Sequence, residues 1–405
     1  MTETPVSPVP HSAALYLGVV QFFFATTWTL YVIYLPQLLQ QAGIDASWLP
    51  WILVGDQIII ALMDVATGFW VDRVRRGLAS MGAWMLGLTA ISCAAFLVLP
   101  FTGANAALLL IAIVVWALTS SALRAPPWAL MSRYAAAPAV PWMSALMLSG
   151  TAVAGALAPY LGVALRDIDP RIPFALSTLT LLATVGGLVF VERRLAQASP
   201  SPAGEQEAPY DTEAPGAKRE VGMFCIALLV MAAAFQVHFA LNSAHQYERF
   251  ADKADLQYLM PVFWIGFNLL MFPAAGFVKR HGPLKIMAAG GALGAMATLA
   301  AALAPGLNSL IAAQFVAGGC WGAVSVASYS AAIAYGRKSR EGALLGLLYS
   351  MLALAAFIRI AAYASDMAQH PAFDEVLPWL PLAGWMLGAL LLWGVLAAAG
   401  RDKVN

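Results

Sequence analysis

Twelve long stretches of apolar residues recur along this chain of 405 residues, and they decide what it can fold into. A helix needs about 20 apolar residues to cross the hydrocarbon core of a bilayer. We predict membrane-spanning helices over 13–40, 48–71, 78–100, 106–134, 140–165, 172–191, 222–243, 256–278, 284–305, 309–335, 341–365 and 376–399. The predicted fold class is therefore an all-α integral membrane protein with 12 transmembrane helices.

The shortage of charge leads to the same conclusion. The sequence is 61% hydrophobic and 11% charged, whereas a soluble globular protein is about a quarter charged. Lipid must therefore be the solvent for much of the surface. The net charge of +1 indicates no nucleic-acid partner. Cys93, Cys225 and Cys320 lie inside apolar stretches without metal-ligand or disulfide spacing, so we expect buried packing residues.

One long polar segment divides the chain. Residues 193–221 contain the run SPSPAGEQEAPYDTEAPGAKRE, which is rich in Pro, Glu, Ala and Gly and cannot bury a core. We predict a disordered cytoplasmic linker there, between a six-helix bundle over 13–192 and a second six-helix bundle over 222–400. Short cytoplasmic tails are expected at 1–12 and 401–405.

The distribution of basic residues sets the predicted orientation. With the N-terminus inside the cell, the inner loops hold 16 of the 22 Lys and Arg residues. The outer loops hold four, namely Arg166, Arg171, Arg249 and Lys253. Cytoplasmic loops of membrane proteins carry such an excess. Both termini are therefore predicted to be cytoplasmic, and the protein to be multi-pass in the plasma membrane (the inner membrane of a bacterium).

A sequence motif follows the second predicted helix. Gly68-Phe-Trp-Val-Asp72-Arg73-Val-Arg-Arg76 resembles the G-x-x-x-D-R-x-G-R-R signature of the major facilitator superfamily, with arginine in place of the second glycine. A degenerate copy, Ala-Gly-Phe-Val-Lys-Arg-His-Gly282, follows the eighth predicted helix. The resemblance implies two pseudo-symmetric six-helix bundles and a solute transporter that works by alternating access. It also implies a gating motif made of Gly68, Asp72, Arg73, Arg76, Lys279, Arg280 and Gly282.

Asp72 has a predicted partner elsewhere in the sequence. Asp64, Gly68 and Asp72 recur every four residues and share one helical face. A carboxylate at the membrane boundary can accept hydrogen bonds from a helix N-terminus, and a glycine lets the neighbouring helix come close. The start of the eleventh predicted helix, with Gly342-x-x-x-Gly346, offers such an end. We predict this contact; the alternative is that Asp72 is only a boundary charge.

Two further resemblances concern single helices. The string Asp64-Val-Ala-Thr-Gly-x-x-x-Asp is similar to the D-P-x-x-G-x-x-x-D segment of melibiose-type sugar–cation symporters, in which the first acid takes part in cation coupling. Val65 replaces the proline here. The string Ala-Pro159-x-x-Gly162 resembles the G-P-x-x-G motif of antiporters, although small residues at this spacing also serve helix packing.

Four charged residues fall inside predicted spans, where a charge near the bilayer centre costs about 2.5–3.5 kcal/mol or more. Asp56 and Asp64 are candidates for proton coupling, because a carboxylate in a cavity can take up and release a proton. Arg124 precedes two prolines, which should kink the fourth span. Arg124 and Arg359 each need a carboxylate, a backbone carbonyl or an anionic substrate group, and both are candidates for substrate binding.

Polar and aromatic side chains complete the candidate site. His238, Asn242 and His245 follow one another at four- and three-residue steps, so we expect them on one face of the seventh span. His238 is a candidate for proton coupling because histidine titrates near neutrality, and Asn242 for substrate binding. No metal is expected, because no third ligand lies near the two histidines. Aromatic candidates for the wall of a substrate cavity are Trp28, Tyr31, Trp116, Trp264, Trp321 and Tyr363.

The predicted function is secondary active transport of a small organic solute, coupled to protons. The two arginines favour an anionic metabolite, while the antiporter resemblance favours multidrug efflux. No G-x-x-x-x-G-K-[ST] loop occurs in the sequence, so this polypeptide has no ATP site of that kind. We expect no cofactor and a monomer in the lipid bilayer. The competing classes are an intramembrane enzyme, for which no Gly-x-Ser-x-Gly or His-Glu-x-x-His string is present, and a non-transporting receptor.

Overall fold

The computed structural model describes residues 11–74, 81–198, 217–336, 340–365 and 371–401. Within these ranges the chain forms helices joined by short turns, without a β-strand. The same ranges contain 12 helical segments that are long and apolar enough to cross a membrane. The predicted all-α membrane fold is confirmed.

The N-terminal half contains the first six spans. They are α1 (His11–Gln41), α2 (Leu49–Val74), α3 (Met81–Val98), α4 (Ala106–Ser120) continued by α5 (Ala125–Tyr134), α6 (Val140–Ala164) and α7 (Arg171–Ala198). The fourth span is thus built from two helices, as expected from its prolines.

The C-terminal half contains the other six spans. They are α8 (Ala217–Gln236) continued by α9 (Ser243–Glu248), α10 (Leu256–Leu259) continued by α11 (Pro261–His281), α12 (Pro283–Ala302), α13 (Leu307–Gly336), α14 (Glu341–Ala364) and α16 (Leu380–Arg401). The short helix α15 (Pro371–Val376) precedes the last span.

The helices extend into the range predicted to be a linker. α7 continues to Ala198 and α8 begins at Ala217, so both ends of the range 193–221 are helical. Residues 199–216 lie outside the described residues, and the disordered linker stays a prediction there. The predicted tails are also shorter, because α1 begins at His11 and α16 includes Arg401. The three cysteines are buried and free, as expected.

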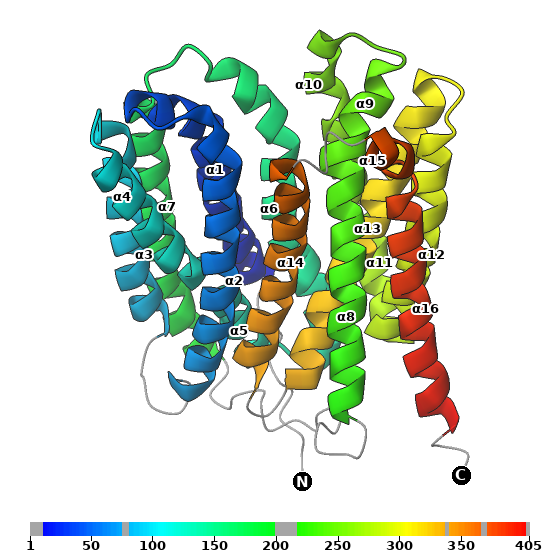
Figure 1. Cartoon of the computed structure of the whole chain (residues 1–405). Helices are drawn as coiled ribbons and strands as arrows, with labels where there is room; N and C mark the ends of the chain where they lie inside the picture. The colour runs from blue at the N-terminus through cyan, green and yellow to red at the C-terminus, as the bar shows by residue number, and fades with distance from the viewer. Residues whose placement is uncertain (1–10, 75–80, 199–216, 337–339, 366–370, 402–405) are drawn as a thin grey trace.

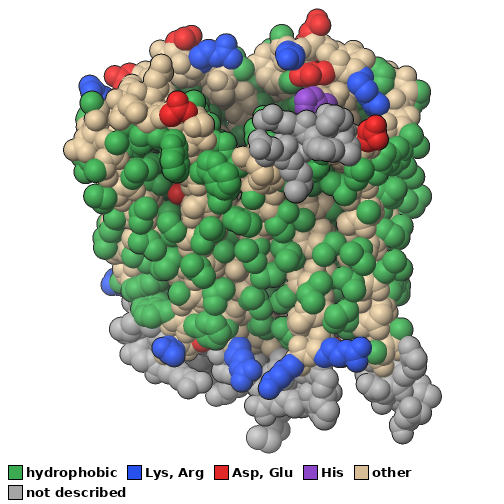
Figure 2. Space-filling view, in the orientation of Figure 1, with side chains coloured by type: hydrophobic (Ala, Val, Ile, Leu, Met, Phe, Trp, Pro, Cys, Tyr) green, Lys and Arg blue, Asp and Glu red, His purple; other side chains and the backbone are tan. Residues whose placement is uncertain are grey.

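The two halves stand side by side (Figure 1), the first coloured blue to green and the second green to red. At the seam between them α2 packs against α14, and α6 packs against α11. We call the end of the molecule where α2 ends and α14 begins, at the bottom of Figure 1, the lower face, and the opposite end the upper face. Figure 2 shows apolar side chains over the middle of the molecule, Lys and Arg along its lower edge, and charges of both signs at its upper edge.

Glycines allow several spans to touch backbone to backbone. A Cβ atom added at Gly150 of α6 would overlap the carbonyl oxygen of Gly18 of α1. A Cβ atom added at Gly318 of α13 would likewise overlap the carbonyl oxygen of Phe263 of α11. Gly162 differs, because it has open space around its Cα. In lipid the hydrophobic effect does not drive helices together, and van der Waals packing at such close contacts stabilises the helix pairs instead.

Candidate functional site

A central cavity of about 610 Å³ lies between the two halves. Its walls come from α1, α2 and α6 on one side and from α8, α11, α13 and α14 on the other. Five of the predicted substrate-binding residues line it: Trp28, Arg124, Trp264, Trp321 and Arg359. The cavity is therefore the place where the two halves can hold a solute together.

The cavity wall is largely aromatic. Phe235 stacks on Trp321 with ring centroids 4.6 Å apart, and Trp264 meets Phe235 edge-on at 6.1 Å. Trp264 reaches across the seam to Gly155 of α6, where an added Cβ atom would lie 2.6 Å from Cε2 of the indole. Such rings offer a large apolar surface at low entropic cost. The wall suits a solute with a bulky apolar body.

Arg359 is the unpartnered charge of the cavity. It lies on α14, and its side chain lines the cavity. Its Nε atom is buried and has no hydrogen-bond partner among the described residues. A buried charge without a partner is strongly unfavourable, and five N–H donors of a guanidinium match a carboxylate or phosphate. Arg359 therefore has N–H donors left for an anionic group.

Arg124 lies at the break in the fourth span. A 3₁₀ turn, Ser121–Leu123, ends α4, and α5 starts immediately afterwards with two prolines. Proline disfavours the α conformation for the preceding residues and removes a backbone donor. The break directs the Arg124 side chain toward α2 and α14, and the kink predicted from the sequence is present.

Arg124 has internal partners, in contrast to Arg359. Its Nε atom donates to both carboxylate oxygens of Asp64, at 2.8 and 3.0 Å. Its Nη2 atom donates to the backbone carbonyl of Tyr349 at 3.3 Å, and its guanidinium lies 4.6 Å from the centre of the Tyr349 ring. Asp64 is fully buried, whereas the Arg124 side chain is 18% exposed and lines the cavity. Of the partners open in the sequence for Arg124, a carboxylate and a backbone carbonyl are the ones observed.

Three aromatic residues that sequence reasoning missed form the floor beneath Arg124. The indole Nε1 of Trp128 donates to the hydroxyl of Tyr349 at 2.7 Å. The same indole stacks on Tyr329 with centroids 3.9 Å apart. Trp128 belongs to the first half, and both tyrosines belong to the second. Rings with a polar tip inside apolar spans were the available signal for this cross-half contact.

Below the floor, α2 and α14 meet at the predicted contact. Asp72 Oδ1 accepts the N–H of Gly342 at 2.8 Å, and Oδ2 accepts the N–H of Ala343 at 2.8 Å. One turn above, a Cβ atom added at Gly68 would overlap the carbonyl oxygen of Gly342, and it would lie 3.0 Å from the Cα of Gly346. We call these two features the lower-face contact. The hydrogen bonds predicted for Asp72 are confirmed.

The other residues of the predicted gating motif lie at the lower face. Arg73, Lys279 and Arg280 are exposed there, while Arg76 is outside the described residues. Gly282 ends α11 with φ +86°, and its N–H donates to the Val278 carbonyl at 2.9 Å. A glycine is favoured at this position because residues with a Cβ atom rarely adopt a positive φ.

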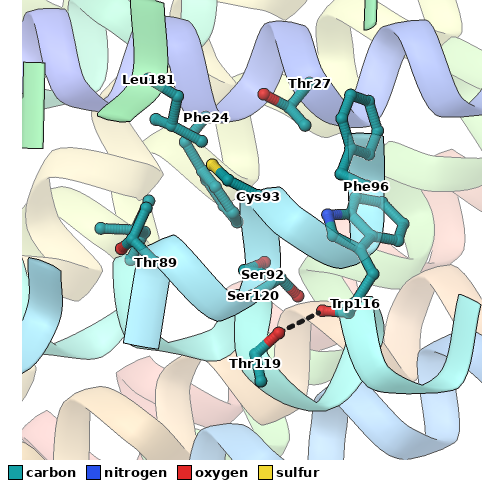
Figure 3. A pocket seen from close by; sticks show the side chains of 11 residues that line it. Phe24, Thr27, Thr89, Ser92, Cys93, Phe96, Trp116, Thr119, Ser120 and Leu181 are labelled. Carbon is teal, nitrogen blue, oxygen red and sulfur yellow. Dashed lines mark hydrogen bonds between the residues drawn. The ribbon is translucent and has the colours of Figure 1, made fainter. Parts of the chain in front are cut away.

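Tyr31, Asp56 and Trp116 lie behind the cavity wall, which corrects the prediction that Tyr31 and Trp116 line the substrate cavity. The Tyr31 hydroxyl donates to Asp56 Oδ2 at 2.6 Å, and Asp56 is 2% exposed. Trp116 packs on Tyr31 at 4.5 Å and lines a separate void of about 10 Å³ inside the first half (Figure 3). This void, surrounded mainly by α3 and α4, is too small for a substrate.

The seventh span departs from the predicted helical face. Val237–Asn242 form a π-helical turn, which adds a residue and rotates all that follows. His238 is therefore buried against Gln314, with Nε2 and Oε1 3.0 Å apart, whereas the His245 side chain is 79% exposed. Asn242 is buried and donates to the Leu377 carbonyl at 3.0 Å. None of the three lines the central cavity within the described part of the chain.

The prediction that Tyr363 lines the substrate cavity is also wrong. Its side chain is 67% exposed and lies one turn above Arg359, near the end of α14. Spacing of four residues put both on one helical face, but the cavity is bounded by Arg359 and Ile360 at this level. As for metals, the described residues contain no group of three His, Cys, Asp or Glu that could hold an ion.

Comparisons with known proteins agree with this architecture. The family model described as Major Facilitator Superfamily matches residues 17–359. No curated protein matches the sequence. Among solved structures, the human organic anion transporter TETRAN has a TM-score of 0.70 at 15% identity, covering 95% of this chain and 99% of that one.

Two further solved structures are similar. The E. coli fucose:proton symporter has a TM-score of 0.63 at 14% identity, over 95% of this chain and 98% of that one. A bacterial homologue of the iron transporter ferroportin, in an outward-facing state, has a TM-score of 0.69 at 13% identity, over 94% of this chain and 98% of that one. At these identities the likeness concerns the fold.

Twelve spans in two bundles around one central cavity define a multi-pass membrane transport protein. The chain belongs to the major facilitator superfamily. As a member of this superfamily it is a secondary transporter.

Proposed function

We propose that this transporter carries a small organic anion with an apolar body, and that Arg359 binds the anionic group. The observation that carries the proposal is the buried Nε atom of Arg359, which has no partner among the described residues although the side chain lines the cavity. A substrate carboxylate would satisfy this charge with bidentate hydrogen bonds. Trp28, Trp264 and Trp321 would enclose the apolar body. An organic anion transporter among the structural neighbours is consistent with this substrate class.

The substrate would enter from the upper face in the conformation described. The lower-face contact closes the seam between α2 and α14 beneath the cavity. Above the cavity lies a second hollow of about 520 Å³, which shares Pro159 and Met260 with the cavity wall and thereby continues it upward. With the basic residues of the lower face in the cytoplasm, the upper face is extracellular or periplasmic. Alternating access then requires the lower-face contact to break while the upper part closes.

Proton coupling would use the pair formed by Asp64 and Arg124. Arg124 lines the same cavity and holds the Asp64 carboxylate at 2.8 Å, so a second polar group of the bound substrate that accepts hydrogen bonds from Arg124 would weaken its hold on Asp64. A buried carboxylate that loses its cationic partner binds a proton more readily. Asp64 lies on the same helical face as Gly68 and Asp72, so its protonation would act on the helix that forms the lower-face contact. Asp56, hydrogen-bonded to Tyr31, is a second candidate for a proton carrier.

Multidrug efflux in exchange for protons is the second candidate function. The aromatic wall and the 610 Å³ volume favour it, and Pro159 of the antiporter-like string lines the cavity. Most simply, the sign of charge on the preferred ligand separates the two functions, because an unpaired Arg359 repels organic cations. In either case we propose a monomer in the plasma membrane (the inner membrane of a bacterium), with both termini cytoplasmic, no bound cofactor and H⁺ as the coupling ion.

Thermal stabilisation of the purified protein by ligands tests the substrate class. The library would contain aromatic and aliphatic carboxylates, each paired with its neutral amide, together with amphipathic amines. We expect carboxylates to raise the melting temperature, and their amides not to do so. The Arg359→Gln variant should lose this response, while Arg171→Gln, at an exposed arginine of the upper face, should keep it.

Liposome uptake of the best carboxylate then tests transport and coupling. An imposed pH gradient should drive uptake by the wild-type protein, and Asp64→Asn should lose the dependence on that gradient. Stabilisation by amines alone, or equal responses to acids and amides, would refute the anion proposal and favour the efflux candidate.

A further inference from the structure

Another hollow, of about 490 Å³, lies on the seam between α2 and α14 at the lower face. Its walls include Val65, Phe69 and Arg73 from α2 and Arg340, Leu344 and Leu347 from the start of α14. It shares no lining residue with the central cavity. We call it the seam groove.

The seam groove is amphipathic along the membrane normal. Val65, Phe69 and Arg73 follow at four-residue steps on α2, which runs toward the lower face. Arg340 and Leu344 stand one turn apart where α14 leaves that face. Both arginines are therefore at the lower end of the groove, and the apolar side chains extend from them toward the middle of the membrane. This is the layout of a lipid, with its head group below and its acyl chains above.

The charges at the lower end fit an anion. Arg73 and Arg340 are exposed, and within the described residues neither guanidinium has a hydrogen bond or an ion pair. The Asp72 carboxylate also borders the groove, but both of its oxygens already accept N–H groups from α14. The same contact offsets the positive end of the α14 helix dipole, so the helix N-terminus has no share in binding an anion here. The two arginines, each with unused N–H donors within the described residues, can hold a phosphate group.

We propose that the seam groove binds an anionic phospholipid of the lower leaflet. The phosphodiester would lie between Arg73 and Arg340, and an acyl chain would run along Phe69, Leu344 and Leu347. A free phosphate ion would use only the lower end and would leave the apolar wall uncovered. The occupant is therefore a lipid rather than a soluble anion.

A lipid in this position touches both halves of the transporter. Arg73 belongs to the first half and Arg340 to the second, and they flank the lower-face contact. Because alternating access must separate α2 from α14, the lipid would stabilise the conformation in which the lower face is closed. Membranes rich in anionic lipid should then hold a larger fraction of the protein in that conformation.

Native mass spectrometry of the full-length protein with phosphatidylglycerol and phosphatidylcholine tests the site. We expect the wild-type protein to bind phosphatidylglycerol more tightly. Loss of one arginine should weaken this binding about fivefold, and the double variant Arg73→Gln/Arg340→Gln about 25-fold. The matched control, Arg219→Gln/Lys285→Gln, removes two exposed basic residues of the lower face outside the groove and should keep wild-type affinity.

Two further measurements separate the lipid from a simple charge effect. Val65→Trp fills the apolar part of the groove, leaves both arginines in place, and should weaken phosphatidylglycerol binding. Inorganic phosphate should not compete with the lipid at millimolar concentration. Equal affinity of the double variant and its control would overturn the proposal, as would full competition by phosphate or an unchanged affinity of Val65→Trp.

Discussion

Replacing Gly68 by alanine should open the lower face. The new Cβ atom would overlap the carbonyl oxygen of Gly342 and lie 3.0 Å from the Cα of Gly346, so α2 and α14 must separate by about 1 Å or more to restore an ordinary contact of 3.4–4.0 Å. The Asp72 hydrogen bonds, now 2.8 Å, would stretch to about 3.8 Å, which is beyond hydrogen-bonding range.

The expected shift follows from these two bonds. A hydrogen bond to a charged group contributes about 1.5–3 kcal/mol, and the lower value applies because Asp72 is partly exposed. Partial to complete loss of both bonds removes about 1.5–3 kcal/mol from the closed state. The ratio of closed to open molecules should then fall by about tenfold to 150-fold.

Double electron–electron resonance between spin labels can measure this ratio. Labels at Arg193→Cys and Lys285→Cys, one at an exposed lower-face position of each half, should report a longer distance in Gly68→Ala. The three native cysteines are buried, which favours selective labelling. Gly55→Ala is the matched control, because it lies on the same helix with nothing within 4 Å of its added Cβ and has the same gain in helix propensity. Identical distance distributions in the two variants would refute the role assigned to the lower-face contact.

Three other substitutions test the cavity. Arg359→Lys keeps the charge but loses the planar fork, so carboxylate affinity in a binding titration should fall about tenfold rather than vanish. Arg124→Gln leaves the buried Asp64 carboxylate without a cationic partner and should lower the free energy of unfolding by about 3–5 kcal/mol, measured as a lower melting temperature. The added change Asp64→Asn should restore much of this stability. A double variant no more stable than Arg124→Gln would contradict the pairing. Gly155→Ala places a Cβ 2.6 Å from the Trp264 ring and should push the indole into the cavity, so uptake of bulky carboxylates should decline more than that of acetate.

The fold could be predicted from the sequence because a chain that crosses lipid must satisfy its backbone hydrogen bonds internally, which restricts it to few architectures. Every apolar stretch long enough to cross the bilayer corresponds to a span, and the ends differ by only a few residues in most cases. The hydrogen bonds of Asp72 with the start of α14 were also predictable. A motif placed the carboxylate at the boundary, and helix-end chemistry supplied its partner.

The site was less predictable, because it depends on which distant residues meet. Arg124 and Arg359 are alike in sequence, yet among the described residues only Arg124 has a carboxylate in reach, 60 positions away on another span. Periodicity alone also misled on the seventh span, where the π-helical turn at Val237–Asn242 moves His245 off the face of His238. For Tyr363, helical spacing identified the face but not how far up the helix the cavity extends.

Among the described residues, Asp72 of α2 caps the first turn of α14. Arg340 stands at the N-cap position without a side-chain hydrogen bond, and the acceptors for the Gly342 and Ala343 amides are supplied by Asp72 from the other half. Those two amide protons are therefore protected only while the halves are joined at the lower face. The rate at which they exchange with deuterium would therefore report how often the lower face opens in the unlabelled transporter in its membrane.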